Sequence, residues 1–438
     1  MSGRCGATPL AKGLVIGAPR SGSGKTVVTL GLLAALRQRG VVVAPAKTGP
    51  DYIDPTFLAR AALRDAVNLD PWSMTPHRLK QLAATQATGA DLLIVEGVMG
   101  LFDGAADGIG STADLAELLE LPVVLVVDAD RQSQSIAPLV AGFANWRVGV
   151  RVAGVIINRV ASMKHERMLT EALAATGIPC LGAIPRNPAL VLPERHLGLV
   201  LPGEVNAFAG FLDEAATAMG DYVDLDRFQA IAAPLGEGAE DAADLPPLGQ
   251  HMAIARDDAF AFAYPHLLDG WRSQGAQLSF FSPLRNEAPG GDADAVFLPG
   301  GYPELHGATL AAADAFKAGL VAARDRGALL YGECGGFMVL GDALVDKAGA
   351  SHAMAGLLPV TTHIDRPKRI LGYRRLVQSG DLPWPGRLNG HEFHYSSAKQ
   401  SRLNPLFAAA DARGDAMPPM GAVIGRVMGS YAHVIDAA

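Results

Sequence analysis

The sequence is poor in cysteine, in charged residues and in long apolar runs, and each shortage excludes a class of protein. The three cysteines, Cys5, Cys180 and Cys334, lie far apart in the 438 residues. Their spacing is neither a disulfide framework nor a zinc-binding pattern, and it fits a reducing cytoplasm. No apolar run approaches the ~20 residues that span a membrane, and no early segment has the order of a signal peptide. We therefore expect a cytoplasmic protein with no membrane partner.

The charge balance excludes a second class. Only 18% of the residues are charged, the net charge is −7, and the chain contains no basic run. A protein that binds nucleic acid usually gathers Lys and Arg in a patch or stripe, so nucleic acid is not an expected partner. Hydrophobic residues make up 49% of the chain, which is ample for large buried cores.

The order of the apolar runs predicts the fold class. Runs of Val, Ile and Leu alternate with helical stretches, which indicates an α/β protein with parallel sheets covered on both faces. Residues 234–249 contain Gly, Glu, Asp, Ala and Pro but almost no large apolar residue, as is typical of a linker. We therefore predict a nucleotide-binding domain at 1–235, a linker at 236–249 and a second domain at 250–438.

A candidate nucleophile lies in the second domain. Residues 329–331 form an apolar run that predicts a strand, and Gly332-Glu-Cys334-Gly-Gly336 separates it from a predicted helix. Glycines on both sides of Cys334 permit a tight, strained turn, and a helix N-terminus favours the reactive thiolate. The arrangement is a nucleophile elbow with sulfur in place of oxygen. The alternative is a small buried cysteine with a packing role.

Other residues of this domain could complete such a site. Gly300 and Gly301 follow a predicted strand, and the N–H groups of Gly301 and Gly335 could form an oxyanion hole facing Cys334. Paired glycines after a strand are otherwise only a turn. The candidate bases are His391, His394 and His433.

His433 is the preferred base. It follows a predicted last strand, 422–428, and we expect it in the loop beyond that strand. A third triad member would normally be an acid two residues after the histidine, but that position holds Ile435. The site therefore works as a dyad, or another acid such as Asp436 substitutes. His391 and His394 lie in a second cluster that could line a pocket for the substrate of the nucleophile.

The first domain contains a candidate phosphate loop. A short apolar strand, 13–17, precedes a Gly/Ser-rich loop, and an apolar-periodic helix follows at 27–36. Backbone N–H groups of such a loop cradle phosphate oxygens, the lysine reaches the terminal phosphates, and the hydroxyl holds Mg²⁺. The usual leading glycine is Pro19 here, and the alternative is an ordinary turn that opens a helix. The predicted ATP-binding residues of the loop are Gly22, Ser23, Gly24, Lys25 and Thr26.

Polar residues end the other predicted strands of this domain. The carboxyl ends of parallel strands open on the same ligand side, so Lys47 should lie beside the phosphate loop. Glu96 ends an apolar strand, which is where nucleotide-binding folds hold Mg²⁺. Asp103 follows in the next loop, and Asn158 could pair with an adenine edge. Asp51 and Asp54, which follow Lys47, belong to the same predicted edge or to an ordinary turn rich in Asp and Pro.

Long motifs in the second domain resemble a known family. The segments 298–304, 332–338, 390–396 and 429–433 resemble a class I glutamine amidotransferase, in the variant found in corrin-ring amidases. That variant also lacks the acid two residues after the histidine. The segments 20–26, 47–55 and 96–104 are similar to the dethiobiotin-synthetase type of ATP-binding domain. Together, and in this order, they resemble the cobyrinic/hydrogenobyrinic acid a,c-diamide synthase family over essentially the whole chain.

The resemblance implies a two-site reaction. Cys334 would attack the amide of glutamine, pass through a thioester and release ammonia, with His433 shuttling the proton. The ammonia would travel inside the protein to the first domain. There a carboxylate of the macrocycle would attack ATP, and Lys25, Thr26, Glu96 and Mg²⁺ would stabilise the transferred phosphoryl group. The acyl phosphate would then be amidated, first at side chain c and then at a. By resemblance, substrate, metal or phosphate would be oriented by Asp51, Tyr52, Asp54 and Asp103.

Rival functions stay open at this point. The implied partners are small molecules, namely ATP, glutamine and a corrin macrocycle, and we favour metal-free hydrogenobyrinic acid. The same reaction on cobalt-bearing cobyrinate or on nickel sirohydrochlorin is the nearest alternative. A cobyric acid synthase, which amidates four other side chains, fits less well because its motifs differ around the phosphate loop. A different class would be a regulatory P-loop ATPase fused to an inactive amidotransferase domain. A homodimer is plausible for so hydrophobic a chain.

Overall fold

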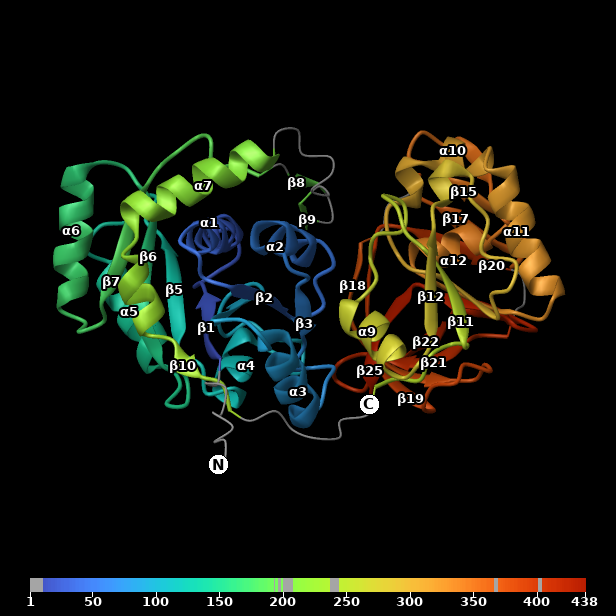
Figure 1. Ribbon diagram of the computed structural model, residues 1–438, viewed down its shortest axis with the longest axis horizontal. Coiled ribbons are helices and arrows are strands. Elements are labelled where there is room, and N and C mark those ends of the chain that lie inside the picture. Colours follow the sequence, from blue (N-terminus) through green and yellow to red (C-terminus); the bar gives the residue numbers. More distant parts are fainter. Residues whose placement is uncertain are drawn as a thin grey trace, which may run out of the picture. The chain divides into compact units, whose positions relative to one another are not determined.

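The computed structural model describes residues 11–192, 194–195, 198–199, 208–236, 244–365, 369–400 and 404–438 (Figure 1). The chain divides into two compact units, Met1–Gly104 with Gly108–Ala242 and Ala105–Asp107 with Ala243–Ala438. The boundaries predicted from the sequence, 1–235 and 250–438, stay a prediction. Residues 237–243, the centre of the predicted linker, and Cys5 lie outside the described residues.

The first unit is built on one mainly parallel sheet. The strand order is β3-β2-β4-β1-β5-β6-β7, and β10 pairs antiparallel with β1. These strands are β1 (Lys12–Gly17), β2 (Val43–Thr48), β3 (Val67–Leu69), β4 (Leu92–Glu96), β5 (Val123–Asp128), β6 (Val152–Val160), β7 (Cys180–Pro185) and β10 (Ala233–Pro234). A two-stranded hairpin adds β8 (Glu194–Arg195) and β9 (Gly198–Leu199). Every residue of β4 and β5 is buried, which explains why these strands are continuous apolar runs.

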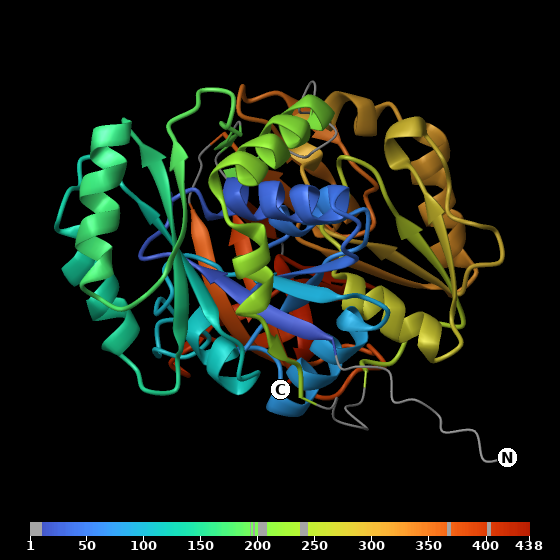
Figure 2. The same cartoon turned by 60° about the vertical axis from the view of Figure 1, so that its left-hand side comes forward.

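Helices cover both faces of this sheet. They are α1 (Lys25–Gln38), α2 (Asp54–Ala62), α3 (Pro76–Ala87), α4 (Thr112–Leu118), α5 (Ile136–Asn145), α6 (Met163–Ala174), α7 (Phe208–Tyr222) and α8 (Leu225–Ala230). In Figure 1, α1, α2 and α7 lie above β1 and β2, and α3 and α4 lie below them. Figure 2 shows α7 packed along α1, and Gly31 of α1 allows a close approach to the carbonyl of Ala215 on α7.

The second unit contains a six-stranded sheet of order β12-β11-β13-β14-β24-β23. All neighbours are parallel except β23 and β24, which form a hairpin. The strands are β11 (His251–Ala255), β12 (Gln277–Phe281), β13 (Ala295–Leu298), β14 (Leu329–Glu333), β23 (Ala422–Ile424) and β24 (Val427–Ser430). The helices of this unit are α9 (Pro265–Ser273), α10 (Gly307–Ala311), α11 (Asp314–Asp325) and α12 (Gly335–Leu340), with 3-10 turns at Pro283–Arg285 and Pro303–Leu305.

Two further sheets complete the second unit. One is antiparallel, of order β22-β21-β18-β19-β25, and the other has the order β16-β15-β17-β20. Their strands are β15 (Ala343–Val345), β16 (Ser351–Ala353), β17 (Val360–His363), β18 (Ile370–Gln378), β19 (Arg387–His394), β20 (Ser397–Gln400), β21 (Phe407–Ala410), β22 (Ala416–Met420) and β25 (Ala432–Ala437).

Two findings bear on the sequence predictions. The α/β class with a parallel sheet in the first domain is confirmed. The predicted last strand, 422–428, is wrong, because Gly425 turns the chain there and His433 lies in a further strand, β25, rather than in a loop. Within the described residues, no helix combines the length and the apolar character that crossing a membrane requires.

Candidate functional site

The phosphate loop of the first unit joins β1 to α1 through two glycines with left-handed backbone. Gly22 has φ 78° and Gly24, which precedes α1, has φ 86°. A Cβ atom at Gly24 would lie 2.2 Å from Nδ2 of Asn158, so both conformation and space require glycine there. Asn158 Nδ2 donates to the carbonyl of Ser23 at 3.0 Å. The side chain predicted to bind adenine therefore also holds the loop against the end of β6, and its contact with the base stays a prediction.

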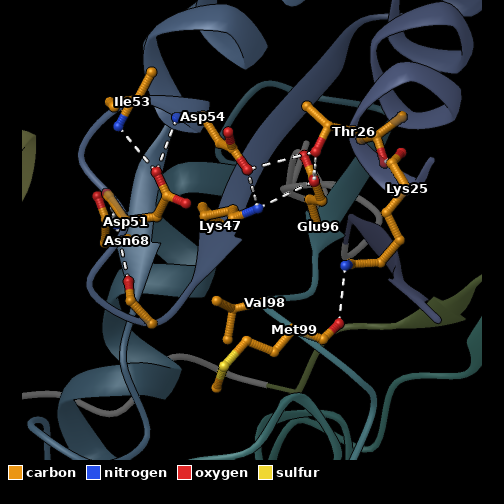
Figure 3. A network of polar contacts seen from close by, with 12 residues as sticks. Lys25, Thr26, Lys47, Asp51, Ile53, Asp54, Asn68, Glu96, Val98 and Met99 are labelled. Atoms are coloured by element: carbon orange, nitrogen blue, oxygen red, sulfur yellow. Dashed lines mark hydrogen bonds and ion pairs between the residues drawn. The ribbon is translucent and has the colours of Figure 1, made fainter. Parts of the chain in front are cut away.

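A buried cluster of charges lies where β2 and β4 end beside α1 (Figure 3). The ammonium of Lys47 lies 2.5 Å from Asp54 Oδ2 and 3.0 Å from Glu96 Oε1. Burial lowers the pKa of Lys47, but the two carboxylates outweigh it and hold that pKa above its ordinary value. Thr26 Oγ1 donates to Glu96 Oε1 at 2.6 Å. The structure thus brings together four of the predicted site residues from four different elements, α1, β2, α2 and β4.

Lys25 lies next to this cluster. Its ammonium donates to the carbonyl of Met99 at 2.9 Å (Figure 3). Burial and then the neighbouring charge of Lys47 lower the pKa of Lys25 to about 8. An ammonium with one carbonyl acceptor and a depressed pKa has a strong preference for an added anion, because the anion would restore the charged form.

The remaining predicted residues of this unit shape the surrounding loops. Asp51 Oδ1 accepts the N–H groups of Ile53 and Asp54, both at 2.9 Å, and so fixes the turn that opens α2. Burial, and then Asp54, raises the pKa of Asp51 to about 6. Asp103 is exposed and accepts the N–H of Gly100 at 2.8 Å, which shapes its own loop.

Asn68 at β3 was missed by the sequence analysis. Its amide nitrogen donates to the carbonyls of Gly49 at 2.9 Å and Asp51 at 2.7 Å, and it is buried (Figure 3). It therefore holds the segment that carries Asp51, half-buried Tyr52 and Asp54. The signal in the sequence was a single polar residue between two apolar ones, Val67 and Leu69.

The oxygen atoms at the end of β4 fit a hard divalent ion. Glu96 Oε2 is buried and has no hydrogen-bond partner among the described residues, although buried polar atoms normally have one. The hydroxyl of Thr26 lies beside the same carboxylate. In the part of the chain that the structure describes, no three His, Cys, Asp or Glu side chains converge on a metal position. Protein ligands as few as these are typical of Mg²⁺, which keeps waters and phosphate oxygens in its shell.

Cys334 of the second unit lies on a strained turn between β14 and α12. Its φ is 46° and its ψ is −104°, an unusual backbone for a residue with a side chain. A Cβ at Gly336 would lie 1.9 Å from the carbonyl oxygen of Leu298, so only glycine permits the turn. The nucleophile elbow is therefore present.

The predicted easy ionisation of Cys334 is wrong for this state of the protein. The side chain is 3% exposed, and burial followed by the charge of Glu304 raises its pKa well above the usual range. The N–H of Gly335 at the start of α12 acts in the opposite direction, but the desolvation is larger. The thiol is thus the resting form, and a base must take its proton.

His433 and Cys334 lie near one another, on either side of Gly300. A Cβ added at Gly300 would be 2.9 Å from His433 Nε2 and 3.2 Å from the Cβ of Cys334, so the two side chains meet at this glycine. Burial, and then His391 and His394, lowers the pKa of His433 to about 3. The imidazole is therefore neutral and can accept a proton on Nε2, the nitrogen on the side of the thiol.

The two predicted oxyanion-hole glycines are neighbours in the structure. A Cβ at Gly335 would lie 3.1 Å from the backbone nitrogen of Gly301. Gly301 follows β13 and Gly335 follows Cys334, and β13 and β14 are paired. Two N–H groups on adjacent strand ends beside a nucleophile could stabilise an oxyanion, and that role stays a prediction.

The carboxylate at His433 comes from a residue that the sequence analysis did not consider. Glu333 Oε2 lies 3.7 Å from His433 Nδ1, and Glu333 is only 2% exposed. Its Oε1 accepts the hydroxyl of Tyr331 and the N–H of Val434, both at 3.0 Å. Asp436, the candidate from the sequence, accepts the N–H of Ala437 instead.

The second histidine cluster lies over the nucleophile. The carbonyl oxygen of Phe393 on β19 is 4.0 Å from Cys334 Sγ. The adjacent Glu392 accepts from Arg374 Nε at 2.8 Å and lies 2.7 Å from His394 Nε2. Burial, and then Arg374, lowers the pKa of His391 to about 3. The predicted substrate pocket beside these side chains stays a prediction.

Comparisons with known proteins match both halves of the chain. Residues 14–200 match the CobQ/CobB/MinD/ParA nucleotide binding domain, and residues 251–438 match the CobB/CobQ-like glutamine amidotransferase domain. Among solved structures, the cell division protein MinD of Aquifex aeolicus is 15% identical with a TM-score of 0.34, and the match covers 52% of this chain and 100% of MinD.

Curated relatives match nearly the full length. The hydrogenobyrinate a,c-diamide synthase of Brucella abortus is 54% identical, over 97% of this chain and 98% of the relative. The protein of that name from Rhizobium meliloti is 52% identical, over 97% of this chain and 99% of the relative. With both domains matched and relatives of this identity along nearly the whole chain, the chain belongs to the hydrogenobyrinate a,c-diamide synthase family.

Proposed function

We propose that the protein amidates the a and c carboxylates of hydrogenobyrinic acid, with ATP as the energy source and glutamine as the nitrogen source. One observation carries the proposal. A chain that matches relatives of this name over 97% of its length combines a phosphate loop with a cysteine–histidine site in the second unit. Glutamine-hydrolysing carbon–nitrogen ligases need both.

The second unit hydrolyses glutamine. Cys334 loses its proton to Nε2 of His433, and the sulfur attacks the side-chain amide of glutamine. The N–H groups of Gly301 and Gly335 stabilise the oxyanion of the tetrahedral intermediate. His433 then returns the proton to the departing nitrogen, which leaves as ammonia, and water hydrolyses the thioester to glutamate. The wall of Glu392 and His394 is the proposed site for the polar end of glutamine.

The first unit activates the carboxylate. ATP lies with its phosphates on the N–H groups of residues 22–26, and Lys25 exchanges the Met99 carbonyl for the terminal phosphates. A macrocycle carboxylate attacks the γ-phosphorus, and ADP leaves. When bound, Mg²⁺ neutralises charge on the phosphates. Thr26 and Glu96 would hold it. Asp51, Tyr52, Asp54 and Asp103 are the proposed contacts with the acceptor, and Lys47 and Asn158 complete the proposed ATP site.

The division of labour follows from elementary chemistry. A carboxylate does not react with ammonia near neutral pH, because its oxygen is a poor leaving group, and phosphorylation removes this obstacle. At that pH most ammonia in water is protonated to ammonium, and ammonium has no lone pair for attack. Nitrogen released inside the protein reaches the acyl phosphate unprotonated, and amide and inorganic phosphate are the products.

The choice of macrocycle is the finer part of the proposal. The relatives are named for hydrogenobyrinate, which favours the metal-free ring over cobyrinate or nickel sirohydrochlorin. Each macrocycle would be incubated with the enzyme, ATP and glutamine, and the products weighed by mass spectrometry. Two successive amidations of hydrogenobyrinic acid at the fastest rate are expected. Preferred amidation of a metal-bearing ring would overturn this choice.

A regulatory ATPase with an inactive amidotransferase domain is the rival from another class. The approach of Cys334 and His433 at Gly300 favours the enzyme. Glutamine hydrolysis that disappears in Cys334→Ser supports the ligase, and absence of hydrolysis with every macrocycle supports the rival. The cytoplasmic location and the homodimer stay predictions, which cell fractionation and analytical ultracentrifugation would test.

A further inference from the structure

We propose that Glu333, the residue immediately before the nucleophile, positions His433 and takes the role of the acid that amidotransferase triads usually carry after the histidine. This inference rests on the proposed hydrolysis of glutamine by Cys334 and concerns one residue of that site. The position two residues after His433 holds Ile435, which is fully buried and cannot accept a proton.

The carboxyl group of Glu333 is fixed on one side and directed at the histidine on the other. Oε1 accepts the hydroxyl of Tyr331 and the N–H of Val434, each at 3.0 Å. Oε2 lies 3.7 Å from Nδ1 of His433. That distance is longer than a hydrogen bond and within the range of an ion pair. A movement of about half an ångström or more would bring it into hydrogen-bond range when the imidazole becomes charged.

The neighbouring charged groups leave this task to Glu333. Glu392 is engaged by Arg374 and His394. Glu304 and Glu333 both raise the pKa of the Cys334 thiol, but among the described residues it is Glu333 that lies at ion-pair distance from the imidazole. Groups near His433 include Glu333 from β14, Cys334 from the elbow, the ring of Phe262, and His391 and His394 from β19. Only a carboxylate among them can stabilise the imidazolium.

The contact also selects the useful tautomer of His433. A proton on Nδ1 directed at Oε2 leaves Nε2 free of hydrogen, and Nε2 is the atom on the side of Cys334. During attack the proton of the thiol moves to Nε2, and the imidazolium lies beside the Glu333 carboxylate. When ammonia leaves, the same proton returns to nitrogen. Once ionised, Glu333 keeps its charge throughout the cycle and bonds to no substrate atom, so it is a positioning residue.

The nucleophile and the positioning acid are consecutive residues, but only the acid belongs to a strand. Residue 333 still belongs to β14, while residue 334 has left the strand through its positive φ. The break in backbone direction lets both side chains reach the histidine ring, Cys334 near Nε2 and Glu333 near Nδ1. A regular strand would send consecutive side chains to opposite faces of the sheet.

The burial of Glu333 adds a pH signature. Burial raises the pKa of this carboxyl to about 8, so the carboxylate forms as the pH rises through that value. The proposal therefore expects kcat/KM for glutamine hydrolysis to rise through an ionisation near there. The rate of alkylation of Cys334 by iodoacetamide should follow the same ionisation, since it reports the thiolate.

The test compares full-length Glu333→Gln with the wild type and with Asp294→Asn. Asp294 is the matched control, because its carboxylate also binds backbone N–H groups, those of Gln250 and His251, but before β13 at the opposite end of the sheet. In Glu333→Gln we expect kcat for glutamine hydrolysis to fall about 10²- to 10⁴-fold. KM for glutamine and amidation with added ammonia should stay unchanged. Asp294→Asn should keep both activities.

The pH profile separates positioning from a structural effect. In Glu333→Gln the ionisation near the raised pKa should disappear from both kcat/KM and the alkylation rate, and Glu333→Asp should restore part of each. Unchanged hydrolysis, or a reduced rate with the wild-type pH profile, would overturn the role of Glu333. A wild-type enzyme that hydrolyses no glutamine would instead overturn the proposed function.

Tyr331→Phe keeps the proposal testable if Glu333→Gln fails to fold, because it conserves the shape of a fully buried ring. It removes only the hydroxyl that fixes Oε1. We expect kcat to fall several-fold at constant KM, with the ionisation shifted to higher pH. In a folded double variant the two losses should not add, since Tyr331 acts through Glu333. Hydrolysis and pH profile identical to those of the wild type would overturn the proposal.

Discussion

Acid should loosen the pairing of β19 with β25 in the second unit, because two buried histidines meet across this strand pair. His391 on β19 is opposite His433 on β25, and burial lowers the pKa of each to about 3. An unfolded histidine titrates near 6.5. The unfolded chain therefore binds protons between these values that the folded chain does not, and stability present above about pH 6.5 is lost as the pH falls.

The size of the effect follows from the same values. Between about pH 7 and pH 5, each histidine should cost about 2 kcal/mol of stability, so the pair costs about 4 kcal/mol. This free energy changes the equilibrium constant for opening the strand pair several hundred-fold. Complete protonation of one site would cost about 5 kcal/mol.

Hydrogen–deuterium exchange measures this opening locally. Peptides from β19 and β25 should lose protection between about pH 7 and pH 5 after correction for intrinsic exchange, by several hundred-fold. Peptides from β5 of the first unit, a buried strand without histidine, serve as the internal control. His391→Gln should roughly halve the change in the free energy of opening between the two pH values. Equal changes in β5 and β25, or an undiminished effect in His391→Gln, would refute the reasoning.

Four substitutions test the two sites separately. Cys334→Ala should abolish glutamine-dependent amidation and leave ammonia-dependent amidation intact, and loss of both would contradict a two-site scheme. Lys25→Ala should reduce amidation from either nitrogen source about 100-fold or more, and normal turnover would remove it from the phosphate site. Glu96→Gln should raise the Mg²⁺ concentration required for half-maximal rate, so an unchanged requirement counts against its role as a ligand. Gly300→Ala should block glutamine hydrolysis only, since the new methyl group would lie 2.2 Å from Cε1 of His433, and undiminished hydrolysis would show that the histidine can move away.

Much of the fold and of both sites could be predicted because the signals are local. Fully buried parallel strands require continuous apolar runs, as in β4 and β5. The phosphate loop needs glycines at fixed offsets from Lys25, and the elbow needs them beside Cys334. The polar residues at the strand ends, Lys47 and Glu96, meet because parallel strands share one carboxyl edge.

The errors concern contacts made through tertiary structure. Glu333 was missed because an acid next to the nucleophile would point to the other face of a regular strand, and only the positive φ of Cys334 changes that. The desolvation that raises the pKa of Cys334 depends on β19, about sixty residues further along the chain. The position of His433 in β25 depends on pairing with β19, which its short local sequence does not reveal.

The salt bridges of Lys47 also bear on whether the first unit stays folded without a metal ion. Its ammonium already separates the carboxylates of Asp54 and Glu96, which would otherwise repel one another inside the protein. An internal cation of this kind is permanent, whereas the proposed Mg²⁺ would bind and leave with nucleotide. Chelation should therefore stop turnover without unfolding the domain. Activity should return at once when Mg²⁺ is added back, in a test tube or in a cell that has been short of magnesium.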